Sequence, residues 1–279
     1  MEQWGPDRID ALVDRLAEAM PHEDLTADEV FTACYDQPGV VFAQQHGVVA
    51  VGVGRAADGD VVGSIRLLVS PGRSIGELLD TAESWARDRG ASRLEVGGAL
   101  PFALWPGVDD RSAHAAALQE RGYVDRGRFD AHRVPSSYRA DPPAGVEVRR
   151  AVRDEDVIAV VLAASTHWSW WSDEIARALD HGTCHMATVS SVDDGEQIIG
   201  VGCHSITRAT WVGPLMVVGD HRRRGVGHAL LGQVCRDLMI ADFPFAEIPE
   251  VASESVERFA ITAGSSPVRR YRRMVLDLR

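Results

Sequence analysis

Residues 217–227 read Val217-Val218-Gly219-Asp220-His221-Arg222-Arg223-Arg224-Gly225-Val226-Gly227, and this stretch decides how the rest of the chain is interpreted. An apolar, β-rich run from Trp211 to Val218 leads into it, and apolar residues at helical spacing follow it from Ala229 to Met239. This pattern predicts a strand, a tight glycine loop and a helix. A helix N-terminus offers unpaired N–H groups, glycines leave room beside the backbone, and guanidinium groups suit phosphate. The stretch therefore predicts a phosphate-binding loop.

The pattern Arg222-x-x-Gly225-x-Gly227, after a strand that reads Gly-Pro-Leu-Met-Val, resembles the acyl-CoA signature of the GNAT acetyltransferase superfamily. It is not a Walker loop, because no Lys-Ser/Thr follows the second glycine, and it is not a dinucleotide fingerprint, because position 230 is leucine. A helix start with a solvated basic run is the alternative reading. The resemblance implies acetyl-CoA as co-substrate. It implies that the following residues bind it: Met216, Val217, Val218, Arg222, Arg223, Arg224, Gly225, Val226, Gly227 and His228.

Composition limits the class of protein. The chain has 279 residues and a formal net charge of -12, which argues against nucleic-acid binding and is compatible with a cationic amine as substrate. Its four cysteines have no C-x-x-C or zinc spacing, so we expect reduced thiols, no bound metal and a cytoplasmic protein. The first twenty residues lack the layout of a signal peptide, and no apolar run approaches the ~20 residues of a membrane helix. We therefore expect no membrane association.

The chain reads as two halves built on one plan. A Pro-, Ser- and Ala-rich segment, 135–145, is the expected linker between a domain at 1–134 and a domain at 146–279. Strands interleaved with helices predict a mixed α/β sheet, and the order of elements resembles that of two tandem GNAT-like domains, each a mostly antiparallel sheet flanked by helices. In the second half we expect strands at 146–150, 184–189, 197–207, 211–218, 245–251 and 268–278, with helices at 154–164, 172–179, 254–263 and from the loop to about 242.

The first half has a shorter loop at the corresponding place. Leu230 lies thirteen positions after Val217 in the second half, whereas Leu78 lies nine positions after Val69 in the first half. The loop 70–76 is therefore four residues shorter than the phosphate-loop span of the second half. We expect this degenerate domain to contribute packing and the shape of the substrate cleft. A weak second site around Arg73 and Gly76 is the alternative.

Acetyl transfer to an amine requires a base for the amine proton and a donor for the oxyanion. The resemblance implies a backbone N–H near Val217 as that donor, and a tyrosine of an F-Y-x-x-x-G pattern as the acid for the leaving thiolate. Here Ala260 stands in the place of that tyrosine, within Phe259-Ala-Ile-Thr-Ala-Gly264. Tyr271 could substitute, although a core aromatic is its plainer role. The candidate bases are Glu250 and His204, with a solvated carboxylate and a sheet histidine as their respective alternatives.

Three tryptophans, Trp168, Trp170 and Trp171, lie in a region that the resemblance places at the acceptor site. Their ring faces, together with Asp173 and Glu174, suit a cationic or aromatic acceptor, and core packing is the alternative. The leading functional prediction is an acetyl-CoA-dependent N-acetyltransferase that acts on a small amine. A non-catalytic acyl-CoA-binding sensor or interaction protein is the runner-up, and acylation of a protein N-terminus or lysine is a third reading. The sequence specifies neither the acceptor nor the oligomeric state.

Overall fold

The computed structural model describes residues 1–21, 23–35, 38–45, 47–56, 59–70, 75–97, 103–191 and 195–279. They form two compact units: Met1–Phe129 with Arg269–Arg279, and Asp130–Val268. The end of the chain therefore belongs to the first unit, and the segment 135–145 lies inside the second. Most of the short loop at 70–76 falls outside the described ranges. None of the helices in those ranges has both the length and the apolar character to cross a bilayer.

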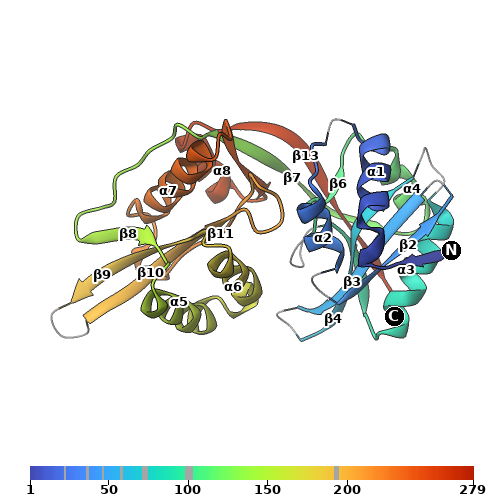
Figure 1. Ribbon diagram of the computed structural model, residues 1–279, viewed down its shortest axis with the longest axis horizontal. Helices are drawn as coiled ribbons and strands as arrows, with labels where there is room; N and C mark the ends of the chain where they lie inside the picture. The colour runs from blue at the N-terminus through green and yellow to red at the C-terminus, as the bar shows by residue number, and fades with distance from the viewer. Residues whose placement is uncertain are drawn as a thin grey trace. The chain divides into compact units, whose positions relative to one another are not determined.

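The first unit is a mixed sheet with helices on both faces (Figure 1). Its strand order is β1-β2-β3-β4-β5-β13, with β6 beside β13, and only β4 and β5 pair in parallel among the described strands. Its elements are β1 (Glu2–Trp4), η1 (Pro6–Arg8), α1 (Ile9–Ala19), α2 (Ala27–Tyr35), β2 (Gly39–Gln44), β3 (Gly47–Arg55), β4 (Val61–Val69), α3 (Gly76–Asp88), β5 (Arg93–Val96), β6 (Val108–Asp109), α4 (Ala113–Glu120), the start of β7 (Val124–Pro135) and most of β13 (Ser266–Asp277).

The strands of this unit contribute to two separate cores, by alternation along β3 and through a register shift at Ala50/Val51 along β4. Val49 and Ile65 pack with α3 and α4, whereas Val48 and Leu67 pack with α1 and α2. Both faces of these strands are thus buried, which explains why β3 and β4 are apolar over almost their whole length.

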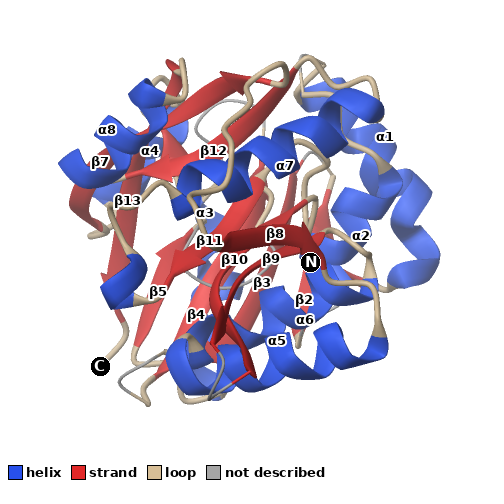
Figure 2. Cartoon of the chain, turned by 90° about the vertical axis from the view of Figure 1, so that its left-hand side faces the viewer, coloured by secondary structure: helices blue, strands red, loops and turns tan. Residues whose placement is uncertain are grey.

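The second unit carries an antiparallel sheet of order β11-β10-β9-β8. Helix α7 packs on one face of it, and α5 and α6 pack on the other (Figures 1 and 2). Strand β12 pairs antiparallel with the end of β7. The predicted mixed α/β class is confirmed in both units. The elements of this unit are β8 (Val146–Arg150), α5 (Asp154–His167), η2 (Ser169–Trp171), α6 (Ser172–Asp180), β9 (Cys184–Ser191), β10 (Gly195–His204), β11 (Val212–Val217), η3 (Gly219–His221), α7 (Val226–Ile240), β12 (Phe245–Val251) and α8 (Glu254–Thr262).

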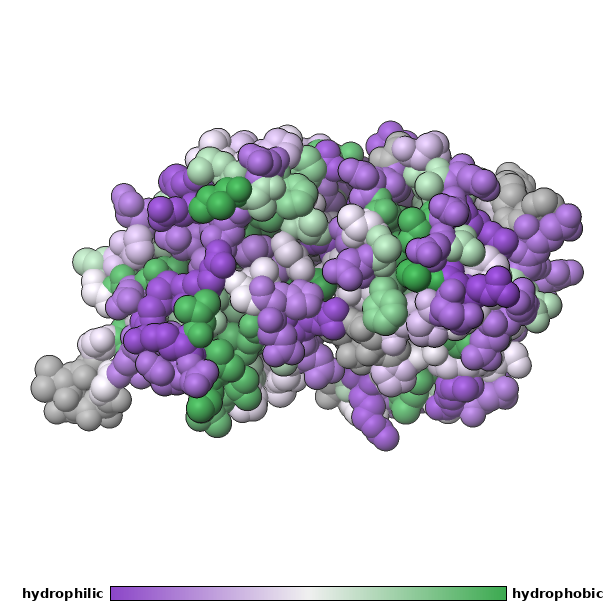
Figure 3. Space-filling view, viewed as in Figure 1, coloured by the Kyte–Doolittle hydropathy of each residue, from purple (hydrophilic) through white to green (hydrophobic). Residues whose placement is uncertain are grey.

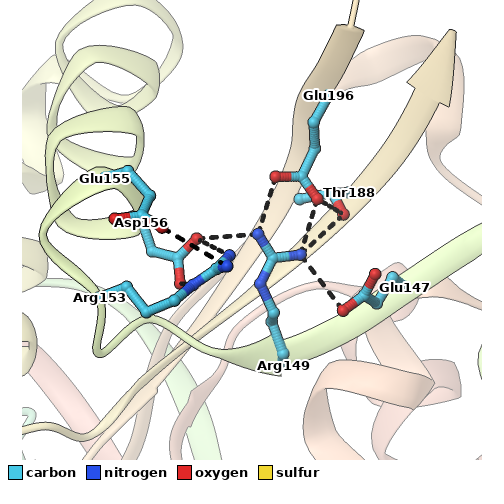
Figure 4. Close-up of polar contacts among 7 residues, drawn as sticks. All are labelled: Glu147, Arg149, Arg153, Glu155, Asp156, Thr188 and Glu196. Carbon is cyan, nitrogen blue, oxygen red and sulfur yellow. Dashed lines mark hydrogen bonds and ion pairs between the residues drawn. The ribbon is translucent and has the colours of Figure 1, made fainter.

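An ion network around one buried carboxylate, Asp156, joins α5 to the sheet (Figure 4). Asp156, in the first turn of α5, accepts hydrogen bonds of 2.8 Å from Arg149 on β8 and from Arg153. Arg149 also donates two bonds of 2.7 Å to Glu196 on β10. The hydrogen bonds from Arg153 and Arg149 hold the pKa of the Asp156 carboxyl well below its usual range. The network therefore joins three elements through one buried carboxylate.

Candidate functional site: the loop before α7

The predicted phosphate loop lies between the end of β11 and the start of α7. Gly225 is the N-cap of α7 and has a left-handed backbone, with φ of 88°. This conformation favours glycine because a Cβ would be strained there. The loop therefore ends in a tight turn that leaves the first N–H groups of α7 without helical partners.

The three arginines of the loop are exposed to solvent. Arg222 folds back toward the strand, and its Nε donates to the carbonyl oxygen of Val217 at 2.9 Å. Within the described residues, no carboxylate forms an ion pair with Arg222, Arg223 or Arg224. The loop thus combines an uncompensated positive charge with a helix N-terminus, which is the arrangement that binds phosphate.

Trp211, the residue before β11, forms a bridge with Glu247 of β12. This bridge is isolated and parallel, and beyond it the two strands belong to different sheets. On the other side of β11, the N–H of Val218 donates to Ile199 of β10 at 2.9 Å. Because N–H directions alternate along a strand, the N–H of Val217 faces the opposite edge of β11, where β12 has diverged. The sequence-predicted oxyanion donor therefore lies on an edge that a ligand could occupy.

Gly227 lies against neighbouring apolar side chains, with room for a Cβ in ordinary van der Waals contact and little beyond it. A Cβ at this position would lie 3.4 Å from Cε2 of Phe259 and 3.5 Å from Cδ2 of Leu215. The side chain of the next residue, His228, packs against Phe259 with its ring tilted by 32° and the ring centroids 4.5 Å apart. A larger residue at 227 would therefore disturb the packing of α7 on α8 and β11 as well as any bound phosphate.

Tyr138 is a neighbour of this loop that the sequence did not indicate. Its hydroxyl lies 2.8 Å from Nδ1 of His228. Burial raises the pKa of Tyr138, and burial followed by the charge of Arg223 lowers the pKa of His228. The sequence shows only that the Pro-rich segment 135–145 contains a tyrosine. Because this segment has no periodicity, the sequence does not show where its side chains pack.

The predicted catalytic residues lie on separate elements. Ala260 is fully buried in α8, and Tyr271 is a core residue of the first unit, stacked on Phe129. Glu250 is half-buried on β12. Its neighbour Glu247 is buried and fixed at the β11–β12 bridge, where it accepts hydrogen bonds from Arg133 (2.8 Å) and from the Trp211 indole (3.3 Å).

His204 is held between the sheet and α7. Its Nε2 lies 3.2 Å from Oδ2 of Asp237, and its Nδ1 lies 2.8 Å from Oγ of Ser205. His185 approaches the same carboxylate oxygen at 2.7 Å. Burial lowers the pKa of His204, and the nearby Asp237 carboxylate opposes that shift. Since His204 is buried and both ring nitrogens have partners, it is poorly placed to take a proton from a substrate.

The tryptophan segment divides into buried and exposed residues. Trp168 is 2% exposed and Trp170 is 59% exposed, while Trp171 is half-buried. Glu174, in the first turn of α6, is buried, and its burial raises the pKa of the carboxyl to about 7. Exposed apolar side chains also gather over the neighbouring α5 (Figure 3): Ile158, Val161 and Leu162. Trp170 is thus the tryptophan of this segment most available to an acceptor.

Comparison with known proteins identifies the fold. No family model matches the chain, and no curated protein matches it by sequence. A solved GCN5-related N-acetyltransferase from Sphaerobacter thermophilus matches with a TM-score of 0.65 and 19% identity, over 100% of this chain and 95% of that one. A tandem GNAT protein from the clavulanic acid biosynthesis pathway matches with a TM-score of 0.69 and 15% identity, over 99% and 98% of the two chains.

A third similar structure is the GCN5-related glucosamine N-acetyltransferase region of a fungal multi-domain GH3 β-N-acetylglucosaminidase. Its TM-score is 0.77 at 17% identity, and the match covers 99% of this chain. This chain spans only 38% of that larger protein. The chain therefore has the fold of tandem GCN5-related N-acetyltransferases, as the sequence resemblance predicted.

Proposed function

We propose that this chain is an acetyl-CoA-dependent N-acetyltransferase that acts on a small amine. The observation that carries the proposal is the loop 222–227, in which three exposed arginines, with no ion pair to any described carboxylate, precede the N-terminus of α7. Pyrophosphate suits this combination of backbone N–H groups and guanidinium forks. The fold shared with GCN5-related acetyltransferases supports acyl-CoA as the ligand that carries the pyrophosphate.

In this proposal the acyl group lies along the edge of β11 from which β12 diverges. The N–H of Val217 donates to the thioester carbonyl oxygen as it becomes an oxyanion. Glu250 takes the proton of the attacking amine, directly or through water. The amine nitrogen bonds to the acetyl carbon while the carbon–sulfur bond breaks. The thiolate of CoA then leaves without a tyrosine acid, which is feasible because a free thiol has a pKa of about 8.5.

The absence of a tyrosine acid suggests a second candidate function. Ala260, at the position where the resemblance places that tyrosine, is fully buried. A protein without that acid could bind acyl-CoA and act as a sensor or interaction protein without turnover. Loss of a general acid typically costs about 10²–10⁴-fold in rate, so slow turnover remains measurable and the two functions can be separated.

The test is a thiol-release assay with acetyl-CoA and a panel of primary amines, combined with a binding titration. The proposed enzyme releases CoA in an amine-dependent manner, and Glu250→Gln lowers the rate while leaving acetyl-CoA binding intact. Substitution of the loop arginines by glutamate should weaken acetyl-CoA binding. Arg236→Glu is the matched charge-reversal control, because Arg236 is exposed near the other end of α7. Tight binding without release for any amine would favour the sensor, and absence of binding would refute both functions.

A further inference from the structure

A buried polar cluster lies between α7 and the sheet, near the opposite end of α7 from the loop. It comprises His185 on β9, His204 on β10 and Asp237 on α7. Both histidines direct Nε2 at one atom, Oδ2 of Asp237, at distances of 2.7 Å and 3.2 Å. Their imidazole rings lie nearly parallel, with an angle of 19° and a centroid separation of 6.1 Å. One carboxylate oxygen is therefore the meeting point of two buried rings.

The hydrogen bonds of His204 leave its Nε2 without a proton when the ring is neutral. Ser205 donates its single hydroxyl proton to the carbonyl oxygen of Ala209. The same Oγ lies 2.8 Å from Nδ1 of His204, so Nδ1 must donate to it. In a neutral ring, Nε2 then carries a lone pair that faces the Asp237 carboxylate at 3.2 Å. Two acceptors at this distance require a proton or a cation between them.

We propose that His185, His204 and Asp237 bind a divalent transition-metal ion, with Zn²⁺ as the best match. Two imidazoles and a carboxylate are donors that zinc prefers, and three protein ligands leave its fourth position for water. The candidate ligand atoms all lie within 4.8 Å of one another. Around a tetrahedral zinc with bonds of about 2.0–2.1 Å, ligand atoms are about 3.3 Å apart, so small side-chain movements suffice.

The surroundings of His204 also match a metal ligand. A histidine that binds a metal through one ring nitrogen usually donates the other N–H to an oxygen, which fixes its tautomer. Nδ1 of His204 has that partner in Ser205, which the Ala209 carbonyl holds in turn. The bound ion would join β9, β10 and α7 at one point. It would thus stabilise the second unit, and this role does not depend on the proposed acyl transfer.

Arg150 is the group that competes with the metal. Its Nη2 lies 2.6 Å from Oδ2 of Asp237, where it neutralises the carboxylate. Its side chain is 44% exposed at the end of β8, so it can turn toward solvent when an ion binds. Removal of this cation should therefore tighten metal binding. A purely structural ion pair would show no such response.

The experiment is a zinc titration of the untagged full chain, previously dialysed against a chelator, by calorimetry and by thermal unfolding. We expect one Zn²⁺ per chain, a higher Tm with zinc than with Mg²⁺, and tetrahedral absorption bands when Co²⁺ replaces zinc. Asp237→Asn and His185→Gln should each weaken zinc binding at least tenfold, whereas Arg150→Leu should strengthen it several-fold. His221→Gln, a histidine outside the cluster, is the matched control and should change neither quantity.

The result that would overturn the proposal is the absence of stoichiometric zinc in both the wild type and Arg150→Leu. A proton shared by His204 and Asp237, together with Arg150, would then explain the cluster. Zinc binding that persists unchanged in Asp237→Asn would also refute it, because the ion would lie elsewhere. Arg150→Leu keeps the test decisive even where a substitution of a buried ligand prevents folding.

Discussion

The hydroxyl of Tyr138 lies 2.8 Å from Nδ1 of His228, in the first turn of α7. Tyr138 belongs to the segment that the sequence suggested as a linker. The same segment packs along α7, where a Cβ at Gly232 would lie 3.0 Å from the backbone of Ala140. Its residues thus help to fix the start of the helix beside the arginine loop.

Tyr138→Phe should weaken acetyl-CoA binding a few-fold without unfolding the protein. The substitution removes one hydrogen bond, worth about 1 kcal/mol. Without that bond, Tyr138 no longer fixes which ring nitrogen of His228 carries the proton, next to the phosphate loop. Calorimetric titration measures the affinity, and nitrogen-15 NMR of the imidazole measures the tautomer. Tyr35→Phe, in the first unit, is the control. An unchanged affinity and tautomer would remove Tyr138 from the site.

Trp168 and Trp170 should respond differently to alanine. Trp168 is buried, so Trp168→Ala should lower the free energy of unfolding by roughly 3–5 kcal/mol. Trp170 is 59% exposed, so Trp170→Ala should leave stability within about 0.5 kcal/mol and raise the KM of the amine. Urea unfolding and steady-state kinetics check the two effects. A KM for the amine that does not change in Trp170→Ala would place the acceptor elsewhere.

Asp156→Asn should destabilise the protein by about 1.5–3 kcal/mol at pH 7, because the buried side chain loses its charge-assisted hydrogen bonds from Arg149 and Arg153. The folded pKa of Asp156 is depressed, so its contribution is fully present above the unfolded pKa of about 3.9 and is lost as the pH falls through the folded value. The difference between wild type and variant should therefore shrink below about pH 4. Urea unfolding at pH 7 and pH 3 measures this trend.

Glu155→Gln is the matched control for that experiment. Glu155 neighbours Asp156 on α5, but its side chain is 71% exposed and its ion pair with Arg153 spans 3.5 Å. Exposed pairs contribute about 0–1 kcal/mol, so this variant should behave as the wild type does at both pH values. Equal losses of stability in the two variants would contradict a special role for the buried carboxylate.

Local patterns sufficed to predict most elements of the second unit. The strands expected at 146–150 and 245–251 correspond to β8 and β12, and the helix expected at 154–164 corresponds to α5, which continues to His167. These segments have clear periodicity and are bounded by turn or capping residues. The mixed sheet flanked by helices therefore follows from the spacing of apolar residues within each segment.

Long-range pairing was not readable from the sequence. The strand expected at 268–278 pairs with β5 of the first unit, where Met274 lies opposite Val96, so the end of the chain joins a unit that begins at Met1. The alternation of residues along a strand shows which side chains are buried, but not which other strand it pairs with. The prediction of domains at 1–134 and 146–279 therefore could not place the last strand in the first unit. The contact of Tyr138 with His228 and the cluster around Asp237 escaped prediction for the same reason, because their residues are far apart in sequence.

The loop variant Arg223→Glu/Arg224→Glu should weaken acetyl-CoA binding by at least about tenfold, since two charge-assisted phosphate contacts would become repulsive. The substituted side chains are exposed, so the fold should be retained. The control Arg236→Glu carries a charge reversal on the same helix and should bind as the wild type does.

Calorimetric titration of the intact chain with acetyl-CoA, on the wild type and these variants, is the sharpest test of acetyl-CoA binding at the arginine loop. The intact chain is required because Arg269–Arg279 belongs to the first unit, so cutting within 135–145 would remove a strand from it. We predict one acetyl-CoA per chain, bound at least about tenfold more weakly by Arg223→Glu/Arg224→Glu and with wild-type affinity by Arg236→Glu. Two equivalent sites, no binding, or unchanged affinity in the loop variant would contradict it.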